Sequence, residues 1–295
     1  MLGLGSNPAL EALVERYGPG LGAGRFLAGT TLTQALAVAL ALNRQGMGIT
    51  LDHLGEEAVS PADQQAATAE YLKTLDALLA QRINGGVSIK LSMVGDGARA
   101  IVDRASQHGQ LVWIDMEHSA TTETTLKTYR TLASDYPRAV GAVLQAYLYR
   151  SAEDLEDLMA IGQPCVRIVK GAYREPVAVA LQDKADVDQN YLALVERAIK
   201  GGAFTAVATH DEKLISKVLG FMHRQHVAPA QVEFQMLYGI KLGVLEELVG
   251  QGYAGRVYVP YGTDWYRYYL RRLAERPANL LFFLKALTTR EPQRT

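Results

Sequence analysis

The sequence predicts an α/β fold, a (βα)8 TIM-like barrel, and two observations support this. Short apolar, β-branched stretches recur eight times from Met47 onward, with helical segments between them and no break in composition. Polar residues gather where these stretches end, which is where barrel enzymes place their sites. The alternative, an open doubly wound sheet, normally carries a glycine-rich dinucleotide motif after its first strand, and the sequence LDHLGEE lacks one.

The chain before these repeats predicts a helical arm. Residues Asn7–Tyr17 and Thr31–Arg44 have helical periodicity, and a glycine-rich stretch separates them. The second segment is apolar at nearly every position, so it should be buried against the rest of the protein. We therefore expect residues 1–46 to form an N-terminal helical arm packed on the barrel and residues 47–295 to form the catalytic barrel domain.

The predicted strands and helices alternate along the rest of the chain. The strands lie in the sequences MGITLDHLG, GVSIKLS, LVWIDME, GAVLQAYL, CVRIVKG, AFTAVATH, VEFQML and RVYVP. The helices span Pro61–Gln81, Ala98–Gln107, Thr121–Leu132, Ala152–Ile161, Asp186–Lys200, Glu212–Gln225, Leu242–Val249 and Asp264–Ala274. The last helix follows its strand through a short turn, so we expect it to lie over the barrel mouth.

Composition excludes several classes of function. A formal net charge of −1 over 295 residues gives no reason to expect a nucleic-acid partner. Cys165 is the single cysteine, which favours a reducing compartment and a buried, unreactive thiol. The apolar run Ala35–Leu42 is too short to span a bilayer, and no signal sequence precedes it. We expect a cytoplasmic protein, and peripheral contact with the inner face of the cell membrane is compatible with this sequence.

The last predicted helix has a face suited to a small anion. Helical spacing places four of its residues on that face: Tyr268, Arg271, Arg272 and Glu275. Two adjacent guanidinium groups repel each other unless a carboxylate neutralises one of them, so Glu275 is expected to position the pair. The other arginine is then available to a carboxylate or phosphate. A solvated basic surface is the alternative, and the position of the helix beside a strand end favours the anion site.

The strand ends supply the remaining candidate residues. These are Asp52, Glu56, Lys90, Asp115, Glu117, Gln145, Tyr147, Arg167, Lys170, Thr209, His210, Gln235, Tyr238, Tyr258 and Tyr261. No metal-ligand spacing and no GxSxG nucleophile motif occurs among them, so we expect no metal. Two chemistries remain open, a Schiff base at Lys90 or Lys170 and redox chemistry on a phosphorylated cofactor.

Seven segments together resemble the proline dehydrogenase family, a flavin-dependent group of (βα)8 barrels. They are SIKLS, WIDME, LQAYL, VRIVKGAYRE, ATHD, FQMLYG and YLRRLAER, and the resemblance runs from Leu51 to Pro277. It implies a monofunctional bacterial enzyme that uses FAD to oxidise L-proline to Δ1-pyrroline-5-carboxylate, the first step of proline catabolism to glutamate. It further implies a quinone electron acceptor and a separate pyrroline-5-carboxylate dehydrogenase as functional partner.

The resemblance also implies a role for individual residues. Arg271 and Arg272 would hold the substrate carboxylate with help from Lys90, while Tyr173, Tyr258 and Tyr268 would pack around its ring, with Leu237 as an apolar wall. The residues expected at FAD are Gln145, Arg167, Lys170, Gly171, Ala172, Tyr173, Thr209 and His210, with Arg167 near flavin N5. Asp115 would not contact the substrate itself but would hold the residues that do. Glu56 would close over the site by pairing with Arg271 of the last helix, and Arg272 would be the fixed contact to the carboxylate.

Overall fold

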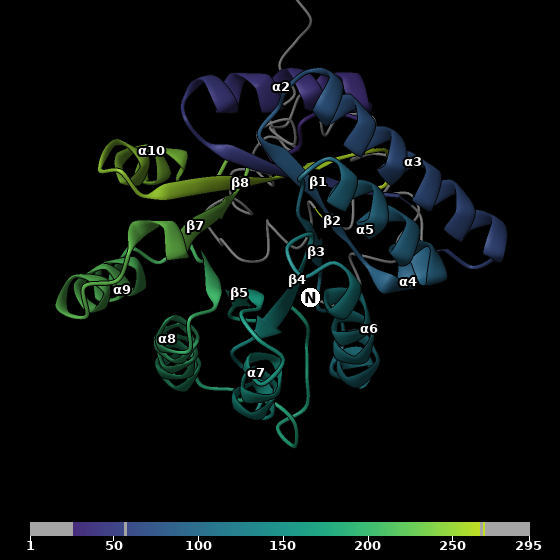
Figure 1. Cartoon of the computed structure of the whole chain (residues 1–295). Helices are drawn as coiled ribbons and strands as arrows, with labels where there is room; N and C mark the ends of the chain where they lie inside the picture. The colour runs from purple at the N-terminus through teal and green to yellow at the C-terminus, as the bar shows by residue number, and fades with distance from the viewer. Residues whose placement is uncertain (1–25, 56–57, 266–267, 269–295) are drawn as a thin grey trace, which may run out of the picture.

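The computed structural model describes residues 26–55, 58–265 and 268 (Figure 1). All eight predicted strands are present in it, run parallel and close into a barrel in the order β1 to β8. The strands are β1 Gly48–His53, β2 Gly85–Ile89, β3 Val112–Ile114, β4 Val140–Gln145, β5 Cys165–Val169, β6 Phe204–Ala208, β7 Val232–Leu237 and β8 Ala254–Tyr261. The predicted barrel is therefore confirmed.

Helices surround the strands in an outer ring, as Figure 1 shows. Those within the described residues are α2 Leu32–Arg44, α3 Pro61–Ala80, α4 Leu91–Val94, α5 Ala98–Gln107, α6 Thr122–Asp135, α7 Ser151–Met159, α8 Lys184–Lys200, α9 Glu212–Arg224 and α10 Leu242–Gly250. Their bounds agree with the predicted helices to within a few residues. The short helix α4 was not predicted, and its first two residues, Leu91 and Ser92, were included in the β2 stretch.

The helix α2 covers the outside of the barrel where β8 meets β1. Thr31 and Gln34 form a capping box that fixes its first turn. Its buried residues are Leu32, Ala35, Leu36, Ala39 and Leu42, and the helix contacts both β1 and β8. This packing agrees with an arm on the barrel, but residues 1–25 lie outside the described residues, so the domain boundary stays a prediction.

The interior of the barrel is filled by side chains rather than open. The indole of Trp113 lies against Gly141 on the next strand, where a Cβ atom would come within 2.5 Å of the ring. Toward the amino ends of the strands, Arg256 Nε donates to Glu233 Oε1 at 2.7 Å and Nη1 donates to the Ile49 carbonyl at 2.8 Å. These contacts fill the lower end of the barrel, and barrel enzymes bind their ligands at the opposite end, where the strands have their carboxyl ends.

Three segments meet where β8 ends at the barrel mouth. The Gly262 N–H donates to the Gly29 carbonyl at 3.1 Å, and the Leu54 N–H donates to the Tyr261 carbonyl at 2.7 Å. Gly262 has φ +130°, and a Cβ there would lie 2.3 Å from the Leu54 carbonyl oxygen, so glycine is required. Trp265 and Tyr268 are helical, and the rest of the last predicted helix lies outside the described residues.

Candidate active site

Lys90 lies at the end of β2 between two carboxylates. Its Nζ is 2.8 Å from Asp52 Oδ1 and 3.9 Å from Asp115 Oδ2. Burial lowers the pKa of Lys90, but the two carboxylates outweigh burial and hold the pKa above its ordinary value. The amine therefore stays protonated at neutral pH, which suits an anion contact and disfavours a Schiff-base nucleophile.

Asp115 is the centre of a buried hydrogen-bond network. Its Oδ1 accepts from Ser88 Oγ at 2.7 Å and from Arg167 Nη1 at 3.0 Å. Its Oδ2 accepts from the Tyr258 hydroxyl at 2.7 Å. Burial and then Asp115 raise the pKa of Tyr258 well above its ordinary value, so the phenol remains a donor. Because both carboxylate oxygens are occupied by side chains from three strands, Asp115 orders the groups around it.

Arg167 is a buried cation with unused hydrogen-bond donors. The residue is only 3% exposed, and its Cζ lies 4.4 Å from the Trp113 ring centroid and 5.5 Å from that of Tyr258. Burial lowers the pKa of the guanidinium, and Asp115 offsets part of this effect. Its Nε and Nη2 have no hydrogen-bond partner in the described part of the chain. Unpaired buried donors are costly, so this geometry favours an acceptor from a ligand.

Three predicted cofactor residues, at the end of β4 and just after β6, are already ordered by hydrogen bonds to neighbouring backbone. Gln145 Nε2 donates to the Glu117 carbonyl at 2.9 Å, and Thr209 Oγ1 accepts from the Asp211 N–H at 3.2 Å. The Leu237 N–H donates to His210 Nε2 at 2.9 Å. A neutral histidine that accepts at Nε2 carries its proton on Nδ1, so His210 presents Nδ1 as its donor.

The segment after β5 combines a held lysine with a glycine cradle. Lys170 Nζ lies 2.5 Å from Asp188 Oδ1 and 3.3 Å from Asp211 Oδ2. Gly171 has φ +118°, and a Cβ there would come within 2.4 Å of the Tyr147 ring. The backbone at Gly171 can thus lie this close to the Tyr147 ring only because glycine has no side chain.

Two tyrosines of the predicted substrate pocket are placed by the described structure. The Tyr173 ring centroid lies 4.2 Å from that of His118, and Tyr268 is buried. Tyr261, which we expected at the mouth, points instead to the outer layer, where its hydroxyl lies 2.8 Å from Thr74 Oγ1 on α3. The expectation was wrong because side chains alternate along β8, so Tyr258 faces inward and Tyr261 outward.

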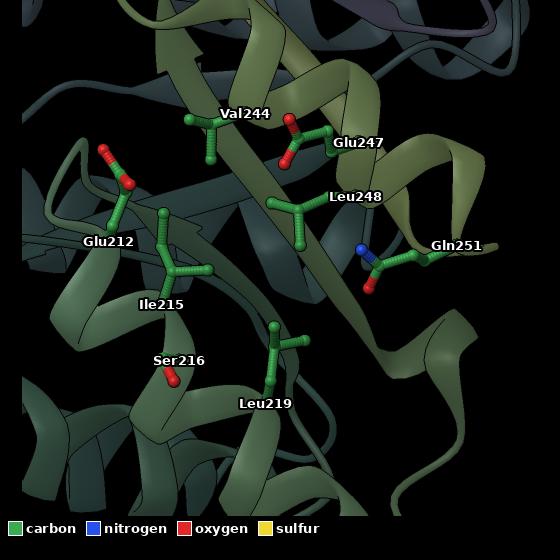
Figure 2. A pocket seen from close by; sticks show the side chains of 8 residues that line it. All are labelled: Glu212, Ile215, Ser216, Leu219, Val244, Glu247, Leu248 and Gln251. Carbon is green, nitrogen blue, oxygen red and sulfur yellow. The ribbon is translucent and has the colours of Figure 1, made fainter.

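A groove outside the barrel is a weaker candidate site. It runs between α9 and α10, encloses about 190 Å³, and is lined by the residues labelled in Figure 2, which are Glu212, Ile215, Ser216, Leu219, Val244, Glu247, Leu248 and Gln251. Its walls are mainly aliphatic with two carboxylates, and it contains none of the predicted site residues.

The described residues hold no cluster of three or more metal-ligating side chains, and none of their helices is long and apolar enough to cross a membrane.

Comparison with known proteins identifies the family. The profile of the proline dehydrogenase family matches residues 35–284. Proline dehydrogenase 1 of Bacillus subtilis is 40% identical over 293 residues, which covers 96% of each chain. The chain belongs to the proline dehydrogenase family. Its relative in Deinococcus radiodurans, a proline dehydrogenase, is 41% identical over 303 residues and covers 97% of this chain and 96% of its own.

The barrel of this proline dehydrogenase family member also matches solved structures. Proline utilization A from Bdellovibrio bacteriovorus, inactivated by N-propargylglycine, superposes with a TM-score of 0.83 at 24% identity. The match covers 89% of this chain and 33% of that longer protein. At this identity the match supports the fold.

Within this proline dehydrogenase barrel, the structure brings four of the predicted site residues together. Lys90, Asp115, Arg167 and Tyr258 form one contact network, as described above. Glu56, Arg271, Arg272 and Glu275 lie outside the described residues, so their roles stay predictions. Ser88 and Trp113 were missed, although both lie on the inward face of their strands, in register with each other. That alternation is the signal that could have found them.

Proposed function

We propose that this protein oxidises L-proline to Δ1-pyrroline-5-carboxylate with FAD as its cofactor and a quinone as electron acceptor. The observation that carries the proposal is Arg167, a buried guanidinium whose Nε and Nη2 lack partners in the described residues. A flavin offers acceptor atoms and negative charge on reduction, which matches such a donor pair. Family membership supports proline as the substrate.

The residues near the barrel mouth fit FAD. Arg167 provides unused donors, and Gly171 lets the loop after β5 pack against the Tyr147 ring, which any Cβ at this position would overlap. The other residues proposed to hold the cofactor are Gln145, Lys170, Ala172, Tyr173, Thr209 and His210. When bound, FAD supplies an acceptor for the hydride that leaves the carbon next to the substrate nitrogen.

The chain's own contribution is to bind and orient the substrate. Lys90, kept protonated by Asp52 and Asp115, supplies positive charge for the substrate carboxylate. Arg271 and Arg272 are proposed as the main carboxylate clamp, with Glu56 closing over it. Tyr258 is held by Asp115, so its ring has a fixed position beside the substrate. Hydride transfer depends strongly on such alignment, which makes orientation the principal task of these residues.

We also propose how the protein works with partners. A quinone acceptor resides in a lipid bilayer, so peripheral contact of this cytoplasmic protein with the inner face of the cell membrane would bring the two together. The product, a cyclic imine, is in equilibrium with an aldehyde by addition of water. A separate pyrroline-5-carboxylate dehydrogenase is therefore the expected consumer of that product.

The absorption spectrum of the purified protein tests this proposal. We expect a flavin absorption band at about 450 nm, as flavoproteins in general show. Anaerobic L-proline should bleach it, while L-alanine, which lacks the ring, should not. A colourless protein that is trapped with its substrate by borohydride would instead indicate Schiff-base chemistry.

A further inference from the structure

The loops after β3 and β5 are joined by one buried carboxylate. Glu175 Oε1 accepts from the Ser119 N–H at 2.7 Å, and Oε2 accepts from the Ser119 hydroxyl at 2.5 Å. His118 Nδ1 lies 3.7 Å from Oε1, and the Glu175 side chain is 6% exposed. The two hydrogen bonds from Ser119 hold the pKa of Glu175 below its ordinary value, so the carboxylate is charged at neutral pH.

The same two loops touch again at an aromatic pair. Tyr173 lies two residues before Glu175, and its ring centroid is 4.2 Å from the His118 ring with an interplanar angle of 53°. His118 and Ser119 therefore contact Tyr173 and Glu175 respectively, over a sequence separation of 56 residues between Ser119 and Glu175. A displacement of either loop moves both contacts together.

The rest of the β5 loop is fixed farther along the chain. The Leu181 N–H donates to the Tyr147 carbonyl at 2.7 Å, and the Tyr149 N–H donates to the Val179 carbonyl at 3.1 Å. Those contacts secure the later part of the loop and leave Tyr173 in the stretch before it. Glu175 and His118 join this earlier stretch to the loop after β3, and Tyr147 joins its start to the loop after β4, where its N–H donates to the Lys170 carbonyl at 2.9 Å.

We propose that Glu175 and Ser119 form a clamp that positions Tyr173 against the ring of the substrate and thereby sets selectivity for a cyclic amino acid. This inference rests on the proposed function, because Tyr173 is assigned there to the substrate pocket. A loop held in its bound geometry loses less entropy when the ligand arrives, so the clamp acts on affinity. The arginine pair proposed for the carboxylate, Arg271 and Arg272, would recognise cyclic and acyclic acids alike, and Tyr173 would favour the ring.

The test compares two ligands in two proteins by calorimetric titration of the flavin-loaded enzyme. The ligands are acetate and the oxygen-ring analogue of proline, tetrahydrofuran-2-carboxylate, which lacks the amine and is not oxidised. In Glu175→Gln the charge is lost and a single oxygen remains to accept the two hydrogen bonds that Ser119 donates. We expect affinity for the ring analogue to fall about tenfold, the factor for one lost hydrogen bond to a charged group. Acetate affinity and flavin content should be unchanged, and KM for L-proline should rise by the same factor with little change in kcat.

Two further variants keep the test decisive. Ser119→Ala removes only the hydroxyl donor and should weaken binding of the ring analogue in the same direction by a smaller factor, so it replaces Glu175→Gln if that variant does not fold. Glu156→Gln is the matched control, because Glu156 forms an exposed ion pair with Arg197 on the outer helices. It should bind both ligands as the wild type does.

The outcomes separate the clamp from the proposed function. If the wild type neither oxidises L-proline nor binds the ring analogue, the proposed function fails. If the wild type does both, and Glu175→Gln and Ser119→Ala keep its ratio of affinities for the two ligands, the clamp is wrong. Equal weakening of both ligands would also overturn it, because that pattern indicates general loss of structure.

Discussion

Asp115 shows how a single carboxylate can organise a barrel interior. It receives hydrogen bonds from Ser88, Arg167 and Tyr258, which lie on three different strands. Its charge compensates a guanidinium that is almost completely removed from water. Removal of one partner from a buried ion pair is expensive because the remaining charge has no compensation.

This argument predicts a difference between two conservative variants. Asp115→Asn keeps the shape of the side chain but leaves Arg167 without its carboxylate, so we expect the free energy of unfolding to fall by about 3 kcal/mol. Tyr258→Phe removes one hydrogen bond to the same carboxylate and should cost about 1 kcal/mol. Urea unfolding of both variants measures this difference. Similar losses in the two would show that charge compensation of Arg167 is unimportant.

At the level of residues, the sequence pointed to charged residues at strand ends more readily than to the polar residues that contact them. Lys90, Asp115 and Arg167 could be selected as candidates because burial of a charge in an apolar strand region is costly unless the charge has a partner or a function. Ser88 and Glu175 could not, since a serine in a strand and a glutamate in a loop are ordinary. Their importance depends on contacts that span 79 residues from Ser88 to Arg167 and 56 residues from Ser119 to Glu175.

At the level of elements, the loop after β5 depends on the backbone of Gly171. Its φ of +118° is unfavourable for any residue with a Cβ, and that atom would meet the Tyr147 ring at 2.4 Å. Gly162, in the turn after α7, has a similar φ of +132° with no atom within 4 Å of the Cβ position. A residue with a Cβ would therefore be strained at both positions, but only at position 171 would its Cβ also overlap another side chain.

A pair of alanine substitutions separates these effects. Gly162→Ala should lower stability by about 1 to 2 kcal/mol through backbone strain alone. Gly171→Ala should lower it further, because its methyl group also overlaps the Tyr147 ring. Only Gly171→Ala should also reduce the flavin-to-protein ratio, because the new methyl group displaces the cradle proposed for the cofactor. Thermal melting and the ratio of flavin to protein absorbance measure the two effects. Equal flavin ratios in both variants would remove Gly171 from the cofactor site.

The pattern of elements was predictable where periodicity was long enough to read. Helices such as Pro61–Ala80 carry several turns of apolar spacing, so their bounds were close. The helix α4 has four residues, too few to show a helical period. Residues Val257–Tyr261 are apolar on both faces, as buried parallel strands are, so the sequence could not tell that Tyr261 faces outward.

At the level of the whole molecule, α2 acts as part of the barrel wall. It precedes β1 in the chain and covers the junction of β1 with β8, where the first and last strands of the chain close the barrel. The closing seam is therefore shielded by a segment that the eight strand-helix repeats do not include. Ala39 on this helix is fully buried, whereas Ala37, two positions earlier and on the opposite face of the helix, is exposed.

The same substitution on both faces of α2 tests this role. Ala39→Asp buries an unpaired carboxylate against the seam, and we expect a loss of about 3 kcal/mol in the free energy of unfolding. Ala37→Asp should change it by less than about 0.5 kcal/mol. Chemical denaturation followed by circular dichroism gives both values. If Ala39→Asp is as stable as Ala37→Asp, α2 is a detachable arm and not part of the wall.

The contact between Trp113 and Gly141 constrains how this lineage can change over evolutionary time. A methyl group at position 141 would overlap the indole, and the indole in turn lies against Arg167. Substitutions here can accumulate in one order only, with Trp113 becoming smaller before Gly141 grows. Related sequences should therefore show these two positions changing together, with intermediates that carry a small residue at both positions and none that carry a tryptophan beside a larger neighbour.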